Sequence, residues 1–358
     1  MRIVQIIDSL ETGGAEKMAV NYANALADKI EFSALVATRS EGLLLEQLSD
    51  KVSYLFINKK KKIDLRAILK LRKFIKSNNI GVIQAHSSSF FIAVLIKIIY
   101  PKVRIIWHDH YGISQNLKSR KSQVLKFSSV LFSGIISVNN ALKTWAKDYL
   151  KCSDVIYLSN FILEPTISAN DFQLHGKDGK RIVCVANLRA QKNHDLLIDG
   201  ASEIHKKFPD WTFHLIGKDF NDSYSEKLYA KVNDLKLADT IFFYGAINNP
   251  QVVFEQCEIA VLTSLSEGLP LVILEYGMFS LPVIATNVGE TSKIIPSSNQ
   301  GLVIESNNLN EFVFFLDKLI TEKELRENVG KNLYSHVKEN FSERIILNEY
   351  ITWLKALN

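Results

Sequence analysis

The sequence contains few residues that cross-link a chain or bind a structural metal. It has only three cysteines, Cys152, Cys184 and Cys257, and no two of them form a C-x-x-C pair. This excludes a disulfide framework and a structural zinc site, and it favours a reduced, cytoplasmic setting. With 16 glycines and 7 prolines in 358 residues, collagen-like and low-complexity chains are excluded as well.

Long apolar runs are also missing. The two longest, residues 90–100 and 124–138, are interrupted by Lys97 or by serines. Neither supplies the roughly 20 apolar residues that a membrane-spanning helix needs. The apolar run before Asp8 is too short for a signal peptide. We therefore expect a soluble protein or one that is peripheral on the inner face of a membrane.

What is present is a folded composition with an uneven charge. The chain is 47% hydrophobic and long enough for two domains. Residues 1–170 hold 24 lysines and arginines against 13 acids, whereas residues 171–358 hold 19 against 25. Much of the positive excess lies in residues 59–76, as a solvated helix face or as a patch for an anionic membrane or a phosphorylated partner. Nucleic acid is not expected, because no aromatic residues interleave with these lysines.

Short β-branched runs alternate with helical patterns along most of the chain. Such alternation predicts parallel sheets with helical crossovers. A polar stretch with Pro165, Gly176 and Gly179 interrupts it and predicts a linker at 166–180. We expect an α/β protein of two doubly wound, Rossmann-like domains, 1–165 and 181–340, whose parallel sheets face an interdomain cleft, and a helix over 341–358 that crosses back to the first domain. The expected strands are 2–7, 32–37, 52–56, 80–85, 103–107, 135–138, 155–158, 181–186, 212–216, 240–243, 259–262, 282–285 and 302–304.

The strongest motif follows the expected strand 259–262. Pro270 suits a helix start, and Gly268 lets main chain approach a ligand closely. The unpaired N–H groups of that helix start are suited to a diphosphate. Glu275, further along the helix, is placed to accept hydrogen bonds from sugar hydroxyls, and Glu267 lies nearest a transferred group.

In the first half of the chain, glycines and histidines also follow expected strands. Gly13 and Gly14 open a helix near Ala15, as a phosphate-approaching loop or as an ordinary turn, and they match neither G-x-G-x-x-G nor the P-loop. His86 ends one strand, and His108-Asp109-His110 follows the next. We expect both loops at the carboxyl edge of the sheet. The H-D-H triplet lacks a third ligand for a metal site, and His86 is either a structural histidine or a cleft contact.

Together these motifs resemble the retaining nucleotide-sugar glycosyltransferases of family 4, which have the GT-B fold. Glu267 and Glu275 match the family's E-x7-E signature. The other segments that resemble family motifs are Gly13 to Lys17, Ser159 to Ile162, Val185 to Asn193, and Leu281 to Thr286.

The resemblance implies a role for each of these residues. In the family's G-R-L-x-x-x-K-G stretch, Lys192 matches the lysine, Asn187 replaces the arginine, and Arg189 is assigned as the second cation of a diphosphate clamp. His110, with His108 as the alternative, and Glu267 are the expected catalytic residues, and His86 is an acceptor or cleft residue. The expected donor-binding residues are Gly13, Gly14, Arg189, Lys192, Gly217, Gly245, Glu267, Gly268, Leu269, Pro270 and Glu275.

The resemblance also implies the reaction. We expect a hexosyltransferase that moves a sugar from a nucleotide donor such as a UDP-sugar, with retention, to a lipid-linked saccharide in capsule or lipopolysaccharide biosynthesis. No D-x-D triplet occurs, which favours a metal-independent enzyme without a cofactor. A nucleotide-sugar epimerase and a noncatalytic nucleotide-sugar or carbohydrate-binding subunit are the alternatives. The nucleotide base, the sugar, the linkage and the oligomeric state are not indicated.

Overall fold

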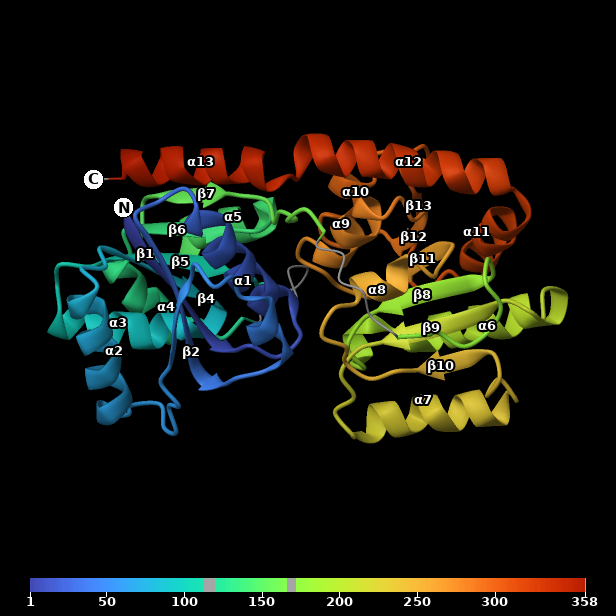
Figure 1. Cartoon of the computed structure of the whole chain (residues 1–358), viewed down its shortest axis with the longest axis horizontal. Coiled ribbons are helices and arrows are strands. Elements are labelled where there is room, and N and C mark those ends of the chain that lie inside the picture. Colours follow the sequence, from blue (N-terminus) through green and yellow to red (C-terminus); the bar gives the residue numbers. More distant parts are fainter. Residues whose placement is uncertain (113–116, 118–119, 166–171, 358) are drawn as a thin grey trace. The chain divides into compact units, whose positions relative to one another are not determined.

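The chain forms two compact units (Figure 1). The computed structural model describes residues 1–112, 117, 120–165 and 172–357. Unit 1 comprises Met1–Leu163 together with Glu343–Asn358, and unit 2 comprises Glu164–Ser342. Residues 166–171 of the predicted linker 166–180 lie outside the described residues. Residues 172–180 belong to unit 2, where His175 stacks on Phe242 with 4.6 Å between ring centroids.

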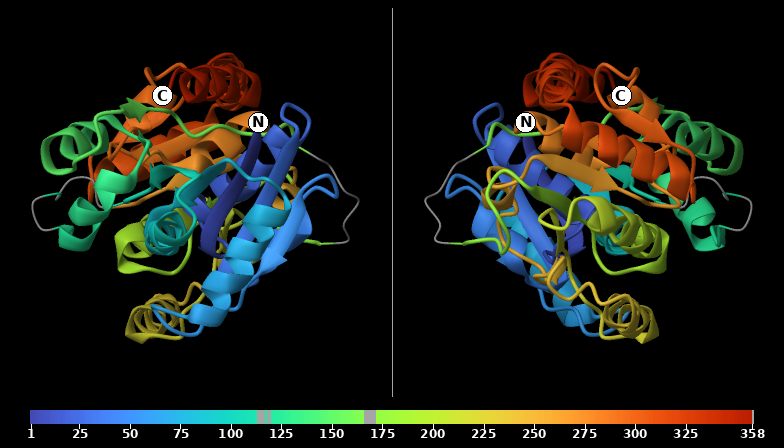
Figure 2. Two further views of the ribbon diagram at one scale, coloured as in Figure 1. Left: turned by 90° about the vertical axis from the view of Figure 1, so that its left-hand side faces the viewer. Right: turned by 90° about the vertical axis from the view of Figure 1, so that its right-hand side faces the viewer.

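Unit 1 is built on a seven-stranded parallel sheet of order β3-β2-β1-β4-β5-β6-β7. Its strands read as continuous apolar runs because both faces of the sheet are covered by helices (Figure 1, Figure 2). The strands are β1 (Arg2–Ser9), β2 (Phe32–Ser40), β3 (Ser53–Phe56), β4 (Val82–His86), β5 (Arg104–Asp109), β6 (Gly134–Ser137) and β7 (Val155–Tyr157). The helices are α1 (Gly14–Ala27), α2 (Leu65–Ser77), α3 (Phe90–Ile99), α4 (Gln123–Ser128), α5 (Asn140–Tyr149) and α13 (Glu343–Ala356).

Alternate residues of these strands belong to different cores. Val4 and Ile6 of β1 pack with the buried faces of α2, α3 and α4. Ile7 packs on the other face with Ala19 and Ala23 of α1. The helix α13 lies beside α1 and buries Ile346, Leu347, Tyr350 and Leu354, whereas Ile345 is exposed.

Unit 2 repeats the design with a six-stranded parallel sheet of order β10-β9-β8-β11-β12-β13. The strands are β8 (Arg181–Val185), β9 (Thr212–Ile216), β10 (Ile241–Phe243), β11 (Ile259–Leu262), β12 (Val283–Thr286) and β13 (Leu302–Ile304). The helices are α6 (His194–Lys207), α7 (Ser223–Asp234), α8 (Gln251–Phe254), α9 (Leu271–Met278), α10 (Thr291–Ile294), α11 (Leu309–Thr321) and α12 (Lys323–Asn340). The prediction of two parallel, doubly wound sheets is confirmed.

The strand orders locate the places where ligands bind in such sheets. The order reverses between β1 and β4 in unit 1 and between β8 and β11 in unit 2. In open α/β sheets the loops beyond the carboxyl ends of these strands form the ligand crevice. Within the described part of the chain, no helix has the length and apolar character required to cross a bilayer.

Candidate active site

The carboxyl edge of the unit 1 sheet carries the predicted histidines. Strand pairing sets His86 of β4 directly beside His108 of β5, and His110 follows β5. The three rings form a stack, with 4.0 Å between the centroids of His108 and His110 and 5.2 Å between those of His86 and His110. The structure thus brings all three together.

Only one of these histidines reaches the surface. His86 is fully buried and His108 is 1% exposed, whereas His110 is half-buried. His86 has hydrogen-bond partners at both ring nitrogens, Gln5 Oε1 at 2.8 Å and His110 Nε2 at 3.0 Å. His86, predicted as a residue that contacts the acceptor, therefore lies behind His110. Of the predicted catalytic pair His108 and His110, the one placed to touch a substrate is His110.

Burial keeps this stack neutral. It lowers the pKa of His110 to about 3, and burial together with the neighbouring rings lowers the pKa values of His86 and His108. A neutral imidazole accepts or donates one hydrogen bond per nitrogen but supplies no positive charge. His110 is thus suited to orient a hydroxyl group and not to stabilise an anion by charge.

The three histidines are close enough to suggest a metal site, since one ligand atom from each lies within 4.8 Å of the others. The ring geometry argues against it. The planes of His86 and His110 differ by only 17° and those of His108 and His110 by 33°. Imidazole lone pairs lie in the ring plane, so rings stacked in this way do not direct three lone pairs at one ion.

A buried ion pair anchors the loop that carries His110. Arg120 donates to both carboxylate oxygens of Asp109, at 2.6 and 2.8 Å. Its guanidinium also lies 4.4 Å from the centroid of Tyr111 and 4.3 Å from that of Trp145. Bidentate pairing of this kind fixes orientation as well as charge, so Asp109 serves to hold the loop.

The first loop of unit 1 begins α1 as expected, with Gly13 at the N-cap and Gly14 as the first helical residue. A Cβ at Gly13 would meet the carboxylate of Glu16 at 2.3 Å, whereas a Cβ at Gly14 would meet nothing within 4 Å. Asp8, just before this loop, lies 3.8 Å from the nearly buried Lys59. Lys59 is therefore part of the sheet edge and not of the exposed basic face.

In unit 2, Lys192 and Glu267 form an ion pair, although they were assigned from the sequence to different parts of the donor. Lys192, at the end of a short 3-10 turn (Ala190–Lys192), places Nζ 2.5 Å from Oε1 of Glu267. Ser264 Oγ donates to the same carboxylate oxygen at 2.6 Å. The side chains of Lys192 and Glu267 are 24% and 10% exposed. The loops after β8 and β11 are thus joined by an ion pair at the point where the sheet order reverses.

Backbone contacts support the loop between β11 and α9. Thr286 Oγ1 donates to Ser264 O at 2.5 Å, and Glu290 N donates to Gly268 O at 2.9 Å. Gly289 has a φ of +59°, and a Cβ there would lie 2.4 Å from the carbonyl oxygens of Glu267 and Gly268. Residues at the end of β12 and in the loop that follows it therefore hold the loop between β11 and α9 in place.

The rest of the predicted motif continues into α9. Pro270 is the N-cap of this helix, and Leu269 beside it is 4% exposed. Glu275 lies in the helix and is 9% exposed. The two predicted acids Glu267 and Glu275 are consequently both held within the fold.

The loop after β8 differs from the family pattern at Asn187 and Arg189. Asn187, at the position of the expected arginine, accepts a hydrogen bond from Lys218 N at 2.8 Å. Arg189 is exposed and lies 4.5 Å from the centroid of Phe220. Asn187 therefore joins the loops after β8 and β9. The positive charge lies two residues later, at Arg189, whose guanidinium contacts the Phe220 ring.

Gly217 and Gly245 meet at the neighbouring strand ends. Gly217 N donates to Gly245 O at 2.9 Å. A Cβ at Gly217 would lie 2.1 Å from Ala186 O, so only glycine fits there. Gly245 has a φ of +70° but open space at its Cβ position.

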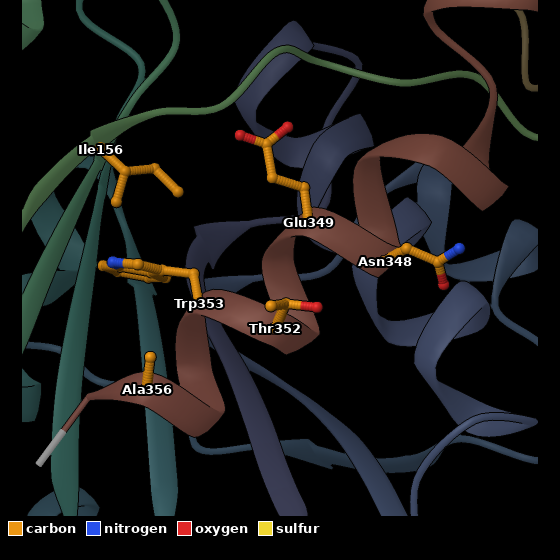
Figure 3. Close-up of a pocket in the computed structure, with 6 residues that line it drawn as sticks. All are labelled: Ile156, Asn348, Glu349, Thr352, Trp353 and Ala356. Carbon is orange, nitrogen blue, oxygen red and sulfur yellow. The ribbon is translucent and has the colours of Figure 1, made fainter.

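Three residues near the histidines were not identified from the sequence: Gln5, Gln84 and Tyr350. Gln5 and Gln84 lie side by side in strands β1 and β4, and both are fully buried. The available signal was a polar residue in the middle of an otherwise apolar strand. A surface hollow elsewhere on unit 1 is lined by Ile156 and by α13 residues, including Trp353 and Glu349 (Figure 3). It contains none of the predicted residues.

Comparisons with known proteins identify the family and the fold of the chain. Residues 12–162 match the model described as Glycosyltransferase Family 4, and residues 168–336 match Glycosyl transferases group 1. An uncharacterized glycosyltransferase of Haemophilus influenzae is 26% identical over 322 residues, which cover 87% of this chain and 88% of that protein. The UDP-Gal:alpha-D-GlcNAc-diphosphoundecaprenol alpha-1,3-galactosyltransferase of Escherichia coli is 23% identical over 354 residues, covering 92% and 90%. The structure of Anabaena Alr3699/HepE in complex with UDP and glucose has a TM-score of 0.80 at 17% identity, with both chains fully covered.

Two parallel Rossmann-like sheets and these matches define a glycosyltransferase of the GT-B fold. The chain belongs to the group 1, family 4 glycosyltransferases. The expected family, fold and enzyme class are confirmed.

Proposed function

We propose that the protein transfers a hexose from a nucleotide-diphosphate sugar, with retention and without a metal ion, to a hydroxyl of a lipid-linked saccharide. The observation that carries the donor assignment is the Lys192–Glu267 pair at the reversal point of the unit 2 sheet. The pair places a cation beside the carboxylate expected at the transferred sugar. The E. coli relative, named for a UDP-galactose donor and a diphosphoundecaprenol acceptor, supports the choice of ligand classes.

The chemistry follows from the residues present. As the anomeric C–O bond breaks, negative charge develops on the departing diphosphate, and Lys192, Arg189 and the start of α9 are the groups suited to stabilise it. The departing phosphate oxygen takes the proton of the acceptor hydroxyl, which attacks the same face of the sugar. Glu267 and Glu275 hold the sugar and nucleotide hydroxyls, and His110 orients the transferred sugar.

The test is transfer by the purified chain with a panel of UDP- and GDP-sugars and a lipid-linked saccharide. We expect release of nucleoside diphosphate that depends on the acceptor, survives EDTA, and gives a product with the donor's anomeric configuration by NMR. An inverted product would overturn retention, and loss of activity restored by Mn²⁺ would overturn metal independence. Donor isomerisation without acceptor would indicate the epimerase, and binding without turnover would indicate a noncatalytic subunit.

We further propose that unit 1 holds this acceptor at an anionic bilayer surface on the inner face of the membrane, in surface polysaccharide biosynthesis. Helix α3 packs between α2 and α4. Together these helices expose large apolar side chains, among them Leu65 at 72% and Phe127 at 74%. The same helices and the segment before α2 also carry exposed basic residues: Lys60, Lys61, Lys62, Arg66, Lys70, Lys73, Lys76 and Lys126. Exposed apolar groups and cations carried by the same helices fit an anionic lipid surface.

A pair of exposed phenylalanines tests this surface. Phe127→Ser removes a 74% exposed phenylalanine from the basic face, and Phe314→Ser removes a 61% exposed phenylalanine from α11 of unit 2. We expect co-sedimentation with phosphatidylglycerol vesicles to fall several-fold for Phe127→Ser and to stay unchanged for Phe314→Ser. Equal losses, or equal binding to phosphatidylcholine vesicles, would refute the assignment.

A further inference from the structure

The histidine stack of unit 1 rests on buried amide side chains. Strand pairing aligns Gln5 with Gln84 and His86 with His108, so the amides and the rings form two adjacent rows on one face of the sheet. Tyr350 of α13, fully buried, reaches this face and donates its hydroxyl proton to Gln84 Oε1. Every member of the group therefore lies within unit 1.

Gln5 fixes the tautomers of His86 and His110. Gln5 Oε1, 2.8 Å from His86 Nε2, can only accept a hydrogen bond. His86 must therefore carry its proton on Nε2 and accept at Nδ1. His110 Nε2 lies 3.0 Å from that Nδ1 and so becomes the donor. A neutral imidazole has one proton, which leaves Nδ1 of His110 unprotonated.

Tyr350 and Gln84 fix the tautomer of the third ring, His108. Burial raises the pKa of Tyr350, so its hydroxyl keeps the proton that it donates to Gln84. Because Gln84 Oε1 is occupied in this way, the amide nitrogen faces His108 Nδ1, at 3.0 Å. His108 then carries its proton on Nε2, an atom without a hydrogen-bond partner among the described residues.

We propose that Gln5, Gln84 and Tyr350 are positioning residues that set the tautomers of the stack: Gln5 acts through His86 so that His110 presents an unprotonated Nδ1 as a hydrogen-bond acceptor for a substrate hydroxyl, and Tyr350 acts through Gln84 on the adjacent His108. This inference rests on the proposed function, in which His110 orients the transferred sugar. Two hydrogen-bonded series form this relay of neutral rings: Gln5 sets the tautomers of His86 and His110, and Tyr350 of α13, acting through Gln84, sets that of His108.

The chain offers a matched control for this hydroxyl. Tyr22 is also fully buried and lies against the same rings, with its centroid 5.5 Å from His108 and 5.1 Å from Tyr350. Its hydroxyl has no hydrogen-bond partner among the residues described. Tyr350→Phe therefore removes a donor from the relay, whereas Tyr22→Phe removes a hydroxyl that orients nothing.

The experiment is ¹⁵N NMR of the imidazole nitrogens in the full-length protein, with His110→Asn used to assign the signals. We expect His110 and His86 protonated on Nε2 only. Tyr350→Phe should give His108 a mixture of tautomers, and Gln5→Met should do the same for His86 and His110. Tyr22→Phe should leave the wild-type pattern.

Kinetics supply the second readout. We expect kcat for sugar transfer to fall about tenfold in Gln5→Met, within the range for a misplaced polar group, and the donor KM to change less than twofold. A proton on Nδ1 of His110, or equal effects of Tyr350→Phe and Tyr22→Phe on His108, would overturn the inference. Stoichiometric Zn²⁺ that shifts all three rings would overturn it in favour of a metal site. The expected tautomers in a protein without transferase activity would instead refute the proposed function.

Discussion

Removal of Lys192 from its pair with Glu267 should destabilise unit 2 more than removal of the glutamate charge. Breaking a buried ion pair from one side costs about 3–5 kcal/mol, because the remaining charge is stranded. Here Ser264 still donates to Glu267, and Lys192 is 24% exposed. We therefore expect Lys192→Met to cost about 2 kcal/mol, and Glu267→Gln less, since the freed lysine can turn to water.

For a unit of this size, 2 kcal/mol corresponds to a fall of roughly 4–8 °C in the Tm of unit 2, measured by scanning calorimetry of the full chain. The double variant Lys192→Met with Glu267→Gln should recover part of that loss, because no charge is left buried. Transfer activity should fall about 10²–10³-fold in Lys192→Met, the range for loss of a group that stabilises developing charge. A double variant less stable than Lys192→Met, or an unchanged Tm and rate in Lys192→Met, would refute the reasoning.

Three further predictions follow from the described contacts. Because the folded pKa of His110 lies near 3, below the unfolded value of about 6.5, its stabilising effect is complete above pH 6.5 and declines by up to about 1.4 kcal/mol per pH unit below it. The Tm of unit 1 should fall on acidification, and His110→Gln should reduce that slope. Gly217→Ala should cost several kcal/mol, since its Cβ would lie 2.1 Å from a carbonyl oxygen, and Gly245→Ala only about 1 kcal/mol, from backbone strain alone; urea unfolding that ranks them in the reverse order contradicts this. Arg120→Lys should cost about 2 kcal/mol by the same assay, because lysine cannot form the bidentate pair with Asp109.

The sheet architecture was predictable because parallel strands that are buried on both faces consist of uninterrupted apolar runs. All the expected strands are present, within three residues at each end. The predicted motif around Glu267 could be placed for a related reason, since it directly follows β11. The expected helix over 341–358 did not indicate which of its apolar residues are buried: Ile345 is exposed while Leu347 is buried, because neighbouring apolar residues of a helix point in different directions.

Contacts between segments far apart in the sequence were not predictable. Lys192 and Glu267 were assigned to different parts of the donor, and no local pattern indicates that they touch. Lys59 was counted with a basic surface run, yet it is 5% exposed because the chain turns there toward Asp8. Gln5, Gln84 and Tyr350 depend on strand register and on the return of α13, which only the assembled unit reveals.

The return of α13 also sets an order for biosynthesis. Unit 1 is discontinuous in sequence, and its final segment fills positions that nothing else occupies: Trp353 covers Gly134 of β6, and Arg104 bonds the Leu357 carbonyl. Residues 343–357 must therefore be synthesised before unit 1 can close, whereas all residues of unit 2 precede them and unit 2 is free to fold earlier. A nascent chain stalled before residue 343 lacks the contacts of Trp353 with Gly134 and of Leu357 with Arg104, so we expect its unit 1 to be cleaved by proteases more readily than its unit 2.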